Sequence, residues 1–263
     1  MVSEFLRLIK GRKIVAFTGS GASAESGIPT FRGKGGLWEK YDPQTYATLP
    51  YAFHTFLKHP EKIANFLVEA YETFLKAEPN ATHYALAKLE EEGAVLGVIT
   101  QNIDNLHQLA GTSQICELHG NTYRFFCRRC GYAHTKTKEE IRKFIDTVDR
   151  QGRHRKNLIK KILSFTGRCR CGKLLITSVI FFGQGLPQAE LNKASFFLEQ
   201  AEVFLCIGAS GVVMPAASFP FYAKQKGCTI IEVNPESSEL SYLADLRIQQ
   251  PSSAFFSQVL EYL

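Results

Sequence analysis

A glycine-rich turn near the start of the chain has the residue types that hold a phosphate group. Residues 19–24 are Gly-Ser-Gly-Ala-Ser-Ala and follow the apolar run 14–17, so they fit the form G-x-G-x-x-G/A directly after a strand. There the glycines let the backbone approach a pyrophosphate, and a following helix offers its N–H groups. Such a turn also occurs for packing alone. One usual companion is missing, because no second strand ends in an acidic residue about 20 residues further on. Glu39 has that spacing but no strand before it.

Three polar side chains further along could act at such a site. Asn102 and Asp104 place an amide and a carboxylate in one loop, and His119 lies between a leucine and a glycine. Loop capping is the alternative role of the first two residues. Histidine side chains in general titrate near neutral pH and can serve as a base there, although most histidines in a chain have no catalytic role.

Four of the seven cysteines form two pairs with the spacing of metal ligands. Cys127 and Cys130 lie in a Cys-x-x-Cys motif, and Cys169 and Cys171 in a Cys-x-Cys motif. Four thiolates give zinc a closed tetrahedral shell, which is structural and not catalytic. The 38 residues between the pairs exceed the common spacing of about 15–20, and metal-free thiols are the alternative. The pattern predicts one structural Zn²⁺ and a reducing, cytoplasmic location.

The segment 131–168 between these pairs carries the whole basic excess of the chain. It holds eleven Lys and Arg against four acidic residues, a net charge of +7, whereas the complete chain has a formal charge of +6. We expect two basic amphipathic helices, at 138–145 and 157–163. They form either a solvated elaboration of the zinc module or a docking surface for nucleic acid or another acidic partner.

The composition fits a folded protein of one or two domains. The chain has 263 residues, of which 45% are hydrophobic and 21% charged. No apolar run approaches the roughly 20 residues of a membrane helix. Residues 1–5 lack the basic start and the apolar stretch of a signal peptide. We therefore expect neither a membrane protein nor a secreted one.

Four short apolar runs end abruptly in small or polar residues, as buried strands of a parallel sheet do. The predicted fold class is α/β, a Rossmann-like doubly wound parallel sheet with helices between the strands. Ligands of such sheets lie at the carboxyl ends of the strands, where this chain places Gly, Asn, Gln and Ser residues. The four runs are 14–17, 95–99, 203–207 and 229–233.

Two stretches interrupt this alternation of strands and helices. We assign 1–39, 80–121 and 176–263 to the Rossmann-like domain. The stretches 40–79 and 122–175 are expected to form a smaller, inserted helical and zinc-binding module.

Several motifs in a fixed order give the chain a specific resemblance. Residues 21–33 are Gly-Ala-Ser-Ala-Glu-Ser-Gly-Ile-Pro-Thr-Phe-Arg-Gly, 100–104 are Thr-Gln-Asn-Ile-Asp, and 118–120 are Leu-His-Gly. The two cysteine pairs follow, and then Phe-Phe-Gly at 181–183 and Val-Asn-Pro at 233–235. This order resembles the sirtuin family of NAD-dependent protein deacylases over nearly the whole chain.

The resemblance implies NAD as co-substrate, acyl-lysine proteins as substrates, and a cleft between the two modules that holds both. His119 matches the general base of the family, Asp104 the residue that binds the nicotinamide carboxamide, and Asn102 the residue that orients the ribose. The amide oxygen of the acyl-lysine attacks the ribose carbon and nicotinamide leaves. His119 then deprotonates a ribose hydroxyl, which attacks the acyl carbon, and water completes the reaction. The products are nicotinamide, free lysine and an O-acyl-ADP-ribose.

The remaining site residues are implied by matching positions. His119 and Asn102 form the catalytic set, and the four paired cysteines hold the zinc. The cofactor-binding set is Gly19, Ser20, Gly21, Ala22, Ser23, Glu25, Thr30, Phe31, Arg32, Trp38, Gln101, Asn102, Ile103, Asp104, Gly208, Ala209, Ser210, Asn234, Pro235 and Glu236. The substrate set, from two backbone segments that pair with the peptide in the family, is Val179, Ile180, Phe181, Phe182, Gly183, Val212 and Val213.

The acyl preference can be predicted in part. Sirtuins that prefer succinyl and malonyl groups carry a Tyr-x-x-Arg pair, and its positions here hold Leu67 and Ala70. Without that arginine we expect an acetyl or a longer apolar acyl group. Two alternative functions remain: mono-ADP-ribosyl transfer, which shares the first bond cleavage, and a non-catalytic zinc module that binds NAD or nucleic acid.

Overall fold

The computed structural model describes residues 1–30, 36–150 and 155–263. The chain divides into two compact units. The first unit consists of residues 1–30, 78–118 and 186–263, and the second, in its described part, of 36–77, 119–150 and 155–185.

The unit boundaries differ from the sequence assignment at the ends of the inserted stretches. Residues 36–39, 119–121 and 176–185 belong to the second unit and not to the sheet domain, and residues 78 and 79 belong to the first unit and not to the inserted module. Hydrogen bonds tie two of these segments together, because Ile180 N–H donates to His119 O (3.0 Å) and Asn121 N–H donates to Ser178 Oγ (3.1 Å).

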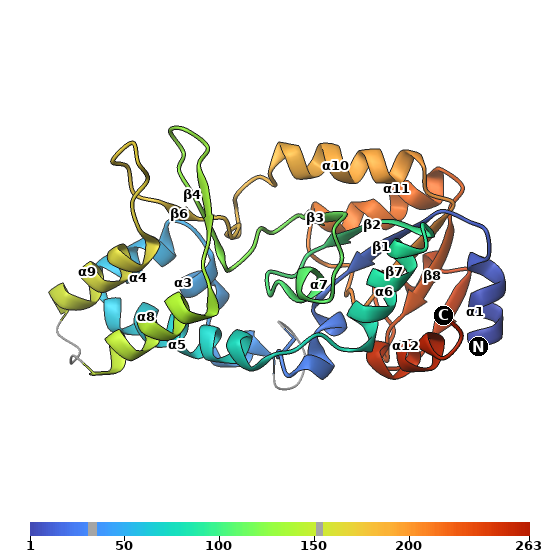
Figure 1. Ribbon diagram of the computed structural model, residues 1–263, viewed down its shortest axis with the longest axis horizontal. Helices are drawn as coiled ribbons and strands as arrows, with labels where there is room; N and C mark the ends of the chain where they lie inside the picture. Colours follow the sequence, from blue (N-terminus) through green and yellow to red (C-terminus); the bar gives the residue numbers. More distant parts are fainter. Residues whose placement is uncertain (31–35, 151–154) are drawn as a thin grey trace. The chain divides into compact units, whose positions relative to one another are not determined.

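A six-stranded parallel sheet in the order β3-β2-β1-β7-β8-β9 forms the centre of the first unit (Figure 1). Its strands are β1 Ile14–Thr18, β2 Val95–Thr100, β3 Ile115–Glu117, β7 Val203–Ile207, β8 Thr229–Val233 and β9 Leu246–Ile248. The chain runs outward in one direction from β1 and in the other from β7, so the order of the strands reverses between these two. This confirms the predicted doubly wound α/β class and places its ligand-binding edge at the ends of β1 and β7.

Helices cover both faces of this sheet, which explains why its strands are apolar throughout (Figure 1). One face packs against α1 (Val2–Ile9), α6 (Ala81–Glu91) and α12 (Ser252–Leu260), around Phe5, Phe255 and Phe256. The other face packs against α10 (Gln188–Glu199) and α11 (Phe219–Gln225), around Phe17 and Phe204. The shorter elements are α7 Leu106–Leu109 and the 3₁₀ turns η1 Ser20–Ala22, η2 Ala24–Ser26, η3 Ala216–Ser218 and η4 Ser241–Leu243.

The second unit combines helices with a small antiparallel sheet. Its helices are α2 Leu37–Lys40, α3 Pro43–Ala47, α4 Tyr51–Lys58, α5 Pro60–Lys76, α8 Lys138–Arg150 and α9 Arg155–Thr166. Its strands, in the order β5-β4-β6, are β4 Arg124–Phe126, β5 Ala133–Thr135 and β6 Ile176–Thr177.

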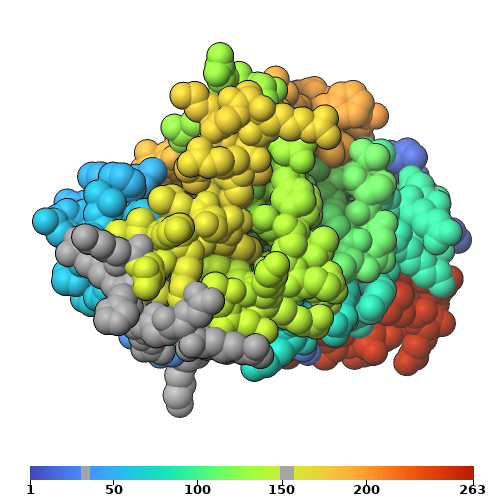
Figure 2. Space-filling model, turned by 60° about the vertical axis from the view of Figure 1, so that its left-hand side comes forward, coloured from blue at the N-terminus to red at the C-terminus, as the bar shows by residue number. Residues whose placement is uncertain are grey.

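The two helices expected in the basic segment are present as α8 and α9. Their apolar sides pack on α5 around Tyr71, Phe144 and Leu158. Figure 2 shows α8 and α9 at the surface of this unit, in yellow-green and yellow. Among the described residues, no helix is both long and apolar enough to cross a lipid bilayer.

Candidate functional site

The glycine-rich turn after β1 packs directly against the end of β7. Gly19 N–H donates to Ile207 O and Gly21 N–H donates to Gly208 O, both at 3.0 Å. A Cβ atom on Gly19 would lie 2.6 Å from Gly208 O, so this position has no room for a side chain. The glycines thus bring the two central strand ends into contact at the point where a parallel sheet binds ligands.

The α-helix that we expected after this turn is absent. The chain forms the two 3₁₀ turns η1 and η2 instead, and Gly27, with φ of 83°, ends the second one. A left-handed residue there stops further helical hydrogen bonds. Within residues 19–30, the turn therefore does not lead into the long helix whose N-terminus many dinucleotide-binding folds aim at the pyrophosphate.

Asn102 is buried two residues beyond β2, with its amide orientation fixed by neighbours. Its Nδ2 donates to Gly19 O (3.0 Å) and to Ser23 Oγ (3.1 Å), and its backbone N–H donates to Thr100 Oγ1 (3.0 Å). Its Oδ1 is buried with no hydrogen-bond partner among the described residues. A buried acceptor of this kind lowers the stability of the fold unless a donor forms a hydrogen bond with it. A ribose hydroxyl of NAD is such a donor, so the site fits this cofactor.

Asp104 is a second buried polar residue in the same loop. Its Oδ2 accepts from Ser23 Oγ (2.7 Å) and its Oδ1 from the Leu106 N–H (2.9 Å). Burial raises the pKa of this carboxyl, and the two hydrogen bonds only partly oppose that effect. Ser23 links both functional side chains, because its hydroxyl donates to Asp104 and accepts from Asn102.

Sequence reasoning missed two buried histidines behind this network. The rings of His83 and His107 lie 4.8 Å apart. His83 Nδ1 accepts from the Asn80 N–H (3.2 Å), which leaves its Nε2 facing Ser23 Oγ at 3.5 Å. His107 Nε2 lies 3.0 Å from Thr18 Oγ1. One sequence signal could have pointed to His83, namely its place three residues after the helix-capping asparagine.

Both histidines are held in the neutral form. Burial lowers the pKa of His83 to about 4. Burial and, to a smaller extent, the neighbouring His83 lower the pKa of His107 well below its ordinary value. Neutral rings add no charge beside Asn102 and Asp104.

Other predicted cofactor residues occupy neighbouring strand ends of the first unit. Asn234 Nδ2, after β8, donates to Ala209 O, after β7 (3.2 Å). Gln101 N–H donates to Thr18 O (2.9 Å). Glu25 accepts from the Ser253 N–H at 2.6 Å and so caps α12. Ser20, Gly21 and Ala22 form η1, Ser23 lies just beyond it, and Thr30, Ile103, Asp104, Gly208, Ser210, Pro235 and Glu236 lie in loops of this unit.

His119 and most of the predicted substrate residues lie in the second unit. His119 follows Leu118 and is half-buried, and Gly120 with φ of 75° has no room for a Cβ atom, which would meet Ser178 O at 2.0 Å.

Phe182 N–H donates to Ala47 O (2.7 Å), and the Phe182 ring lies 6.1 Å from Trp38. Val179 to Phe181 are half-buried and Gly183 is exposed, whereas Val212 and Val213 lie in the first unit. Phe31 and Arg32 lie outside the described residues.

The four paired cysteines converge at the antiparallel sheet of the second unit. Their four sulfur atoms all lie within 4.8 Å of one another, with Cys130 and Cys169 at 3.3 Å and Cys127 and Cys171 at 3.5 Å. Four sulfur donors at these separations fit a tetrahedral, structural zinc ion.

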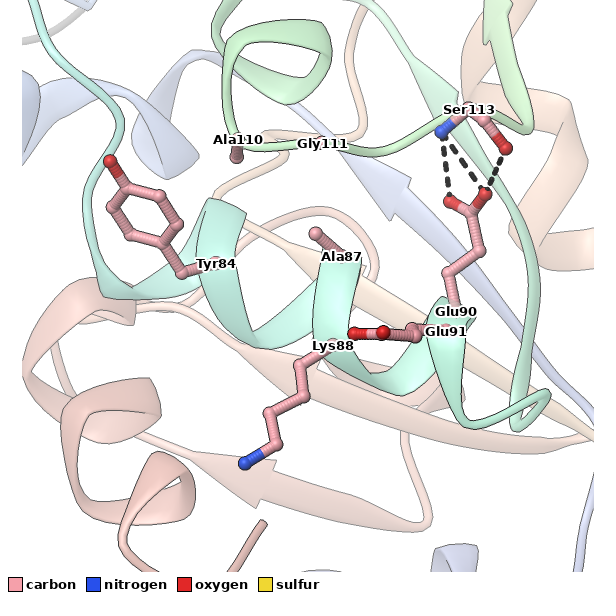
Figure 3. A pocket seen from close by; sticks show the side chains of 8 residues that line it. All are labelled: Tyr84, Ala87, Lys88, Glu90, Glu91, Ala110, Gly111 and Ser113. Carbon is pink, nitrogen blue, oxygen red and sulfur yellow. Dashed lines mark hydrogen bonds between the residues drawn. The ribbon is translucent and has the colours of Figure 1, made fainter.

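A surface pocket of about 540 Å³ lies elsewhere on the first unit, between α6 and the loop before β3. Figure 3 shows Glu90 of α6 bonded to the backbone N–H and the hydroxyl of Ser113. Since α6 leads into β2 and this loop leads into β3, the pocket lies toward the amino ends of the strands. It contains none of the predicted site residues and faces the edge opposite to the glycine-rich turn.

A doubly wound sheet with buried polar groups at its switch point, joined to a four-cysteine unit, defines a nucleotide-binding α/β protein with a structural metal. The sequence model of the Sir2 family matches residues 19–215. The chain therefore belongs to the Sir2 family, whose members are the sirtuins.

Curated relatives and solved structures agree with this membership. An NAD-dependent protein deacylase of Pyrococcus abyssi is 42% identical over 247 residues, which are 93% of this chain and 91% of that protein. One of Aquifex aeolicus is 39% identical and covers 95% of both chains. A Sir2 homologue mutant in complex with ADP-ribose superimposes with a TM-score of 0.80 at 34% identity, over 100% of this chain and 96% of that chain.

Proposed function

We propose that this protein removes acyl groups from lysine side chains of other proteins, with NAD as the co-substrate. The products are nicotinamide, free lysine and O-acyl-ADP-ribose. The observation that carries the proposal is the buried Asn102 amide beside the glycine-rich turn, whose Oδ1 has no partner among the described residues. The names of relatives that cover 93% and 95% of the chain support the same activity. So does a Sir2 structure with a deacetylated peptide and 3'-O-acetyl ADP-ribose, 33% identical over 99% of this chain.

Each residue of the proposed site has one task. NAD supplies a ribose–nicotinamide bond that breaks readily because nicotinamide is a good leaving group. Asp104 holds the carboxamide, and Asn102 Oδ1 accepts a hydrogen bond from a ribose hydroxyl. Ser23 fixes both side chains through its two short contacts. His119 removes the proton from a ribose hydroxyl, so that this oxygen can attack the acyl carbon.

The proposed acyl specificity rests on two positions of α5. Leu67 packs against the apolar core of the second unit, and Ala70 is half-buried. Neither side chain can pair with an acidic acyl tail. A missing charge-assisted pair costs a factor of about 10–100 in the rate of acidic substrates, so we expect acetyl and longer apolar groups to react far faster than succinyl.

A panel of peptides with one acyl-lysine each measures this preference. Acetyl, octanoyl, palmitoyl and succinyl peptides of identical sequence are incubated with NAD, and kcat/KM is determined from the peptide mass. Ala70→Arg serves as a matched variant, since it introduces a cation at the position where the succinyl-preferring sirtuins carry one. Desuccinylation as fast as deacetylation by the unaltered protein would refute the proposal.

We also propose that the exposed side of α8 and α9 can bind an acidic partner, with nucleic acid as the test ligand. Arg142, Lys143 and Lys160 are exposed there. Binding should weaken steeply as the salt concentration rises and should be lost when all three are changed to Gln. Retention of binding by that triple variant would exclude this surface.

The cysteines support a cytoplasmic location as part of the proposal. None of the seven is in a disulfide bond, and Cys116, Cys206 and Cys228 are buried outside the four-cysteine cluster. A reducing compartment keeps such thiols and zinc ligands intact.

A further inference from the structure

We propose that Glu232 is a positioning residue, which holds the loop 234–241 after β8 in the shape that binds the ADP end of NAD. This inference rests on the proposed function. Asp104, proposed to hold the nicotinamide carboxamide, follows β2. Three strand spacings, about 14 Å, separate β2 from β8 across β1 and β7. A loop at the end of β8 therefore suits the opposite end of the dinucleotide.

The carboxylate of Glu232 is buried in β8, with 3% of the residue exposed. Its Oε1 accepts from the Ser238 hydroxyl, and its Oε2 accepts from the Ser241 hydroxyl (2.7 Å) and from Arg247 Nε (3.2 Å). Arg247 is the register partner of Glu232 in β9 and compensates its charge. A buried carboxylate with donors from three side chains is a strong anchor, because charge-assisted hydrogen bonds are about twice as strong as neutral ones.

The hydroxyls of the same two serines also accept hydrogen bonds from backbone N–H groups of the loop. Ser241 Oγ accepts from the Ser238 N–H (2.8 Å), and Ser238 Oγ accepts from the Leu240 N–H (3.0 Å). Each hydroxyl thus bridges the buried carboxylate and a loop amide. Arg247 Nη2 adds one further contact, a hydrogen bond to Ser237 Oγ (2.9 Å), and the 3₁₀ turn η4 begins at Ser241.

The anchored loop also supports the neighbouring loop after β7. Glu239 N–H donates to Ser210 O (3.0 Å), and Asn234 Nδ2 donates to Ala209 O (3.2 Å). A Cβ atom on Gly211 would lie 2.7 Å from Leu240 Cγ, so the two loops are in close contact. Residues 208–210 and 234–236 both belong to the predicted cofactor-binding set. Loss of the anchor would therefore disorder two parts of that set together.

The test compares Glu232→Gln with the unaltered protein by calorimetric titration of ADP-ribose. Glutamine keeps the shape but offers one acceptor oxygen in place of two, so one serine loses its partner. We expect ADP-ribose to bind about tenfold more weakly, because the ligand must then order the loop. In turnover, KM for NAD should rise by a similar factor, while kcat and KM for the acyl peptide stay within about twofold.

Glu90→Gln is the matched control, since Glu90 anchors a different loop by the same chemistry. Its carboxylate accepts from the N–H and hydroxyl of Ser113 and from the Gln114 N–H, on the opposite edge of the sheet (Figure 3). It should affect stability and leave the affinity for ADP-ribose unchanged. If Glu232→Gln does not fold, Ser241→Ala removes one bridge and should show the same effect on binding.

Unchanged ADP-ribose affinity in a folded Glu232→Gln variant, or equal weakening in the Glu90→Gln control, would overturn the inference. Failure of the proposed function has a different signature, because the unaltered protein would then bind no ADP-ribose or remove no acyl group with NAD.

Discussion

His119→Ala should lower the rate of deacylation by about 10²–10⁴-fold while the protein remains folded. The variant lacks the imidazole that takes a proton from the ribose hydroxyl. In the proposed order of steps, release of nicotinamide comes before that proton transfer. Exchange of labelled nicotinamide into NAD, in the presence of acetyl peptide, should therefore persist in the variant.

The measurement pairs nicotinamide exchange with loss of the acyl mass in the same reaction. His54→Ala provides the control, because His54 is exposed on α4 of the same unit and has no proposed role. Thermal unfolding should show both variants folded. Full deacylation by His119→Ala, or loss of exchange and deacylation to the same extent, would contradict its assignment as the base.

Loss of the zinc ion should lower the melting temperature by at least about 10 °C, since structural zinc sites contribute much of the folding free energy of their modules. The core around the cysteines is small. It consists of Phe125, Leu175, Cys127 and Cys169, with Phe165 and Cys171 packed against it. A three-stranded sheet with so little apolar contact needs a further constraint.

Elemental analysis should find one zinc per chain in the unaltered protein and none in Cys127→Ser. Cys228→Ser is the matched control, because Cys228 is a buried thiol of the first unit, outside the four-cysteine cluster, and its Sγ donates to Ala201 O at 3.2 Å. That variant should keep its zinc. A metal-free unaltered protein, or an unchanged melting temperature of Cys127→Ser, would show that the thiols need no metal.

The strands and their functional ends could be predicted because local patterns determine them. Apolar runs that end at Phe17, Ile99 and Ile207 match strands ending at Thr18, Thr100 and Ile207. Gly19, Asn102 and Gly208 follow just beyond these strands. The spacing of the cysteines likewise predicted that the two pairs lie close together in the fold, although 38 residues separate them in the sequence. A zinc ion of this kind requires all four ligands at one site.

The supporting polar network could not be predicted, because its contacts join residues far apart in the sequence. His83 and Ser23 are 60 residues apart, and Thr18 and His107 are 89 residues apart. Glu232 shows the same difficulty, since an acidic residue inside an apolar strand gives no sign of the serines that will meet it. The prediction of a helix directly after the glycine-rich turn was wrong. Gly27 has a left-handed conformation there and ends the second 3₁₀ turn, so the helical hydrogen bonds do not continue past it.

The most direct test of the central claim is the mass balance of one reaction with NAD and a lysine-acetylated peptide. The account predicts one nicotinamide for each acetyl group lost, with the acetyl group recovered on ADP-ribose and none as free acetate in the first turnover. A gain of ADP-ribose mass on the protein or peptide without loss of the acetyl group would contradict it, as would deacetylation that proceeds equally well without NAD.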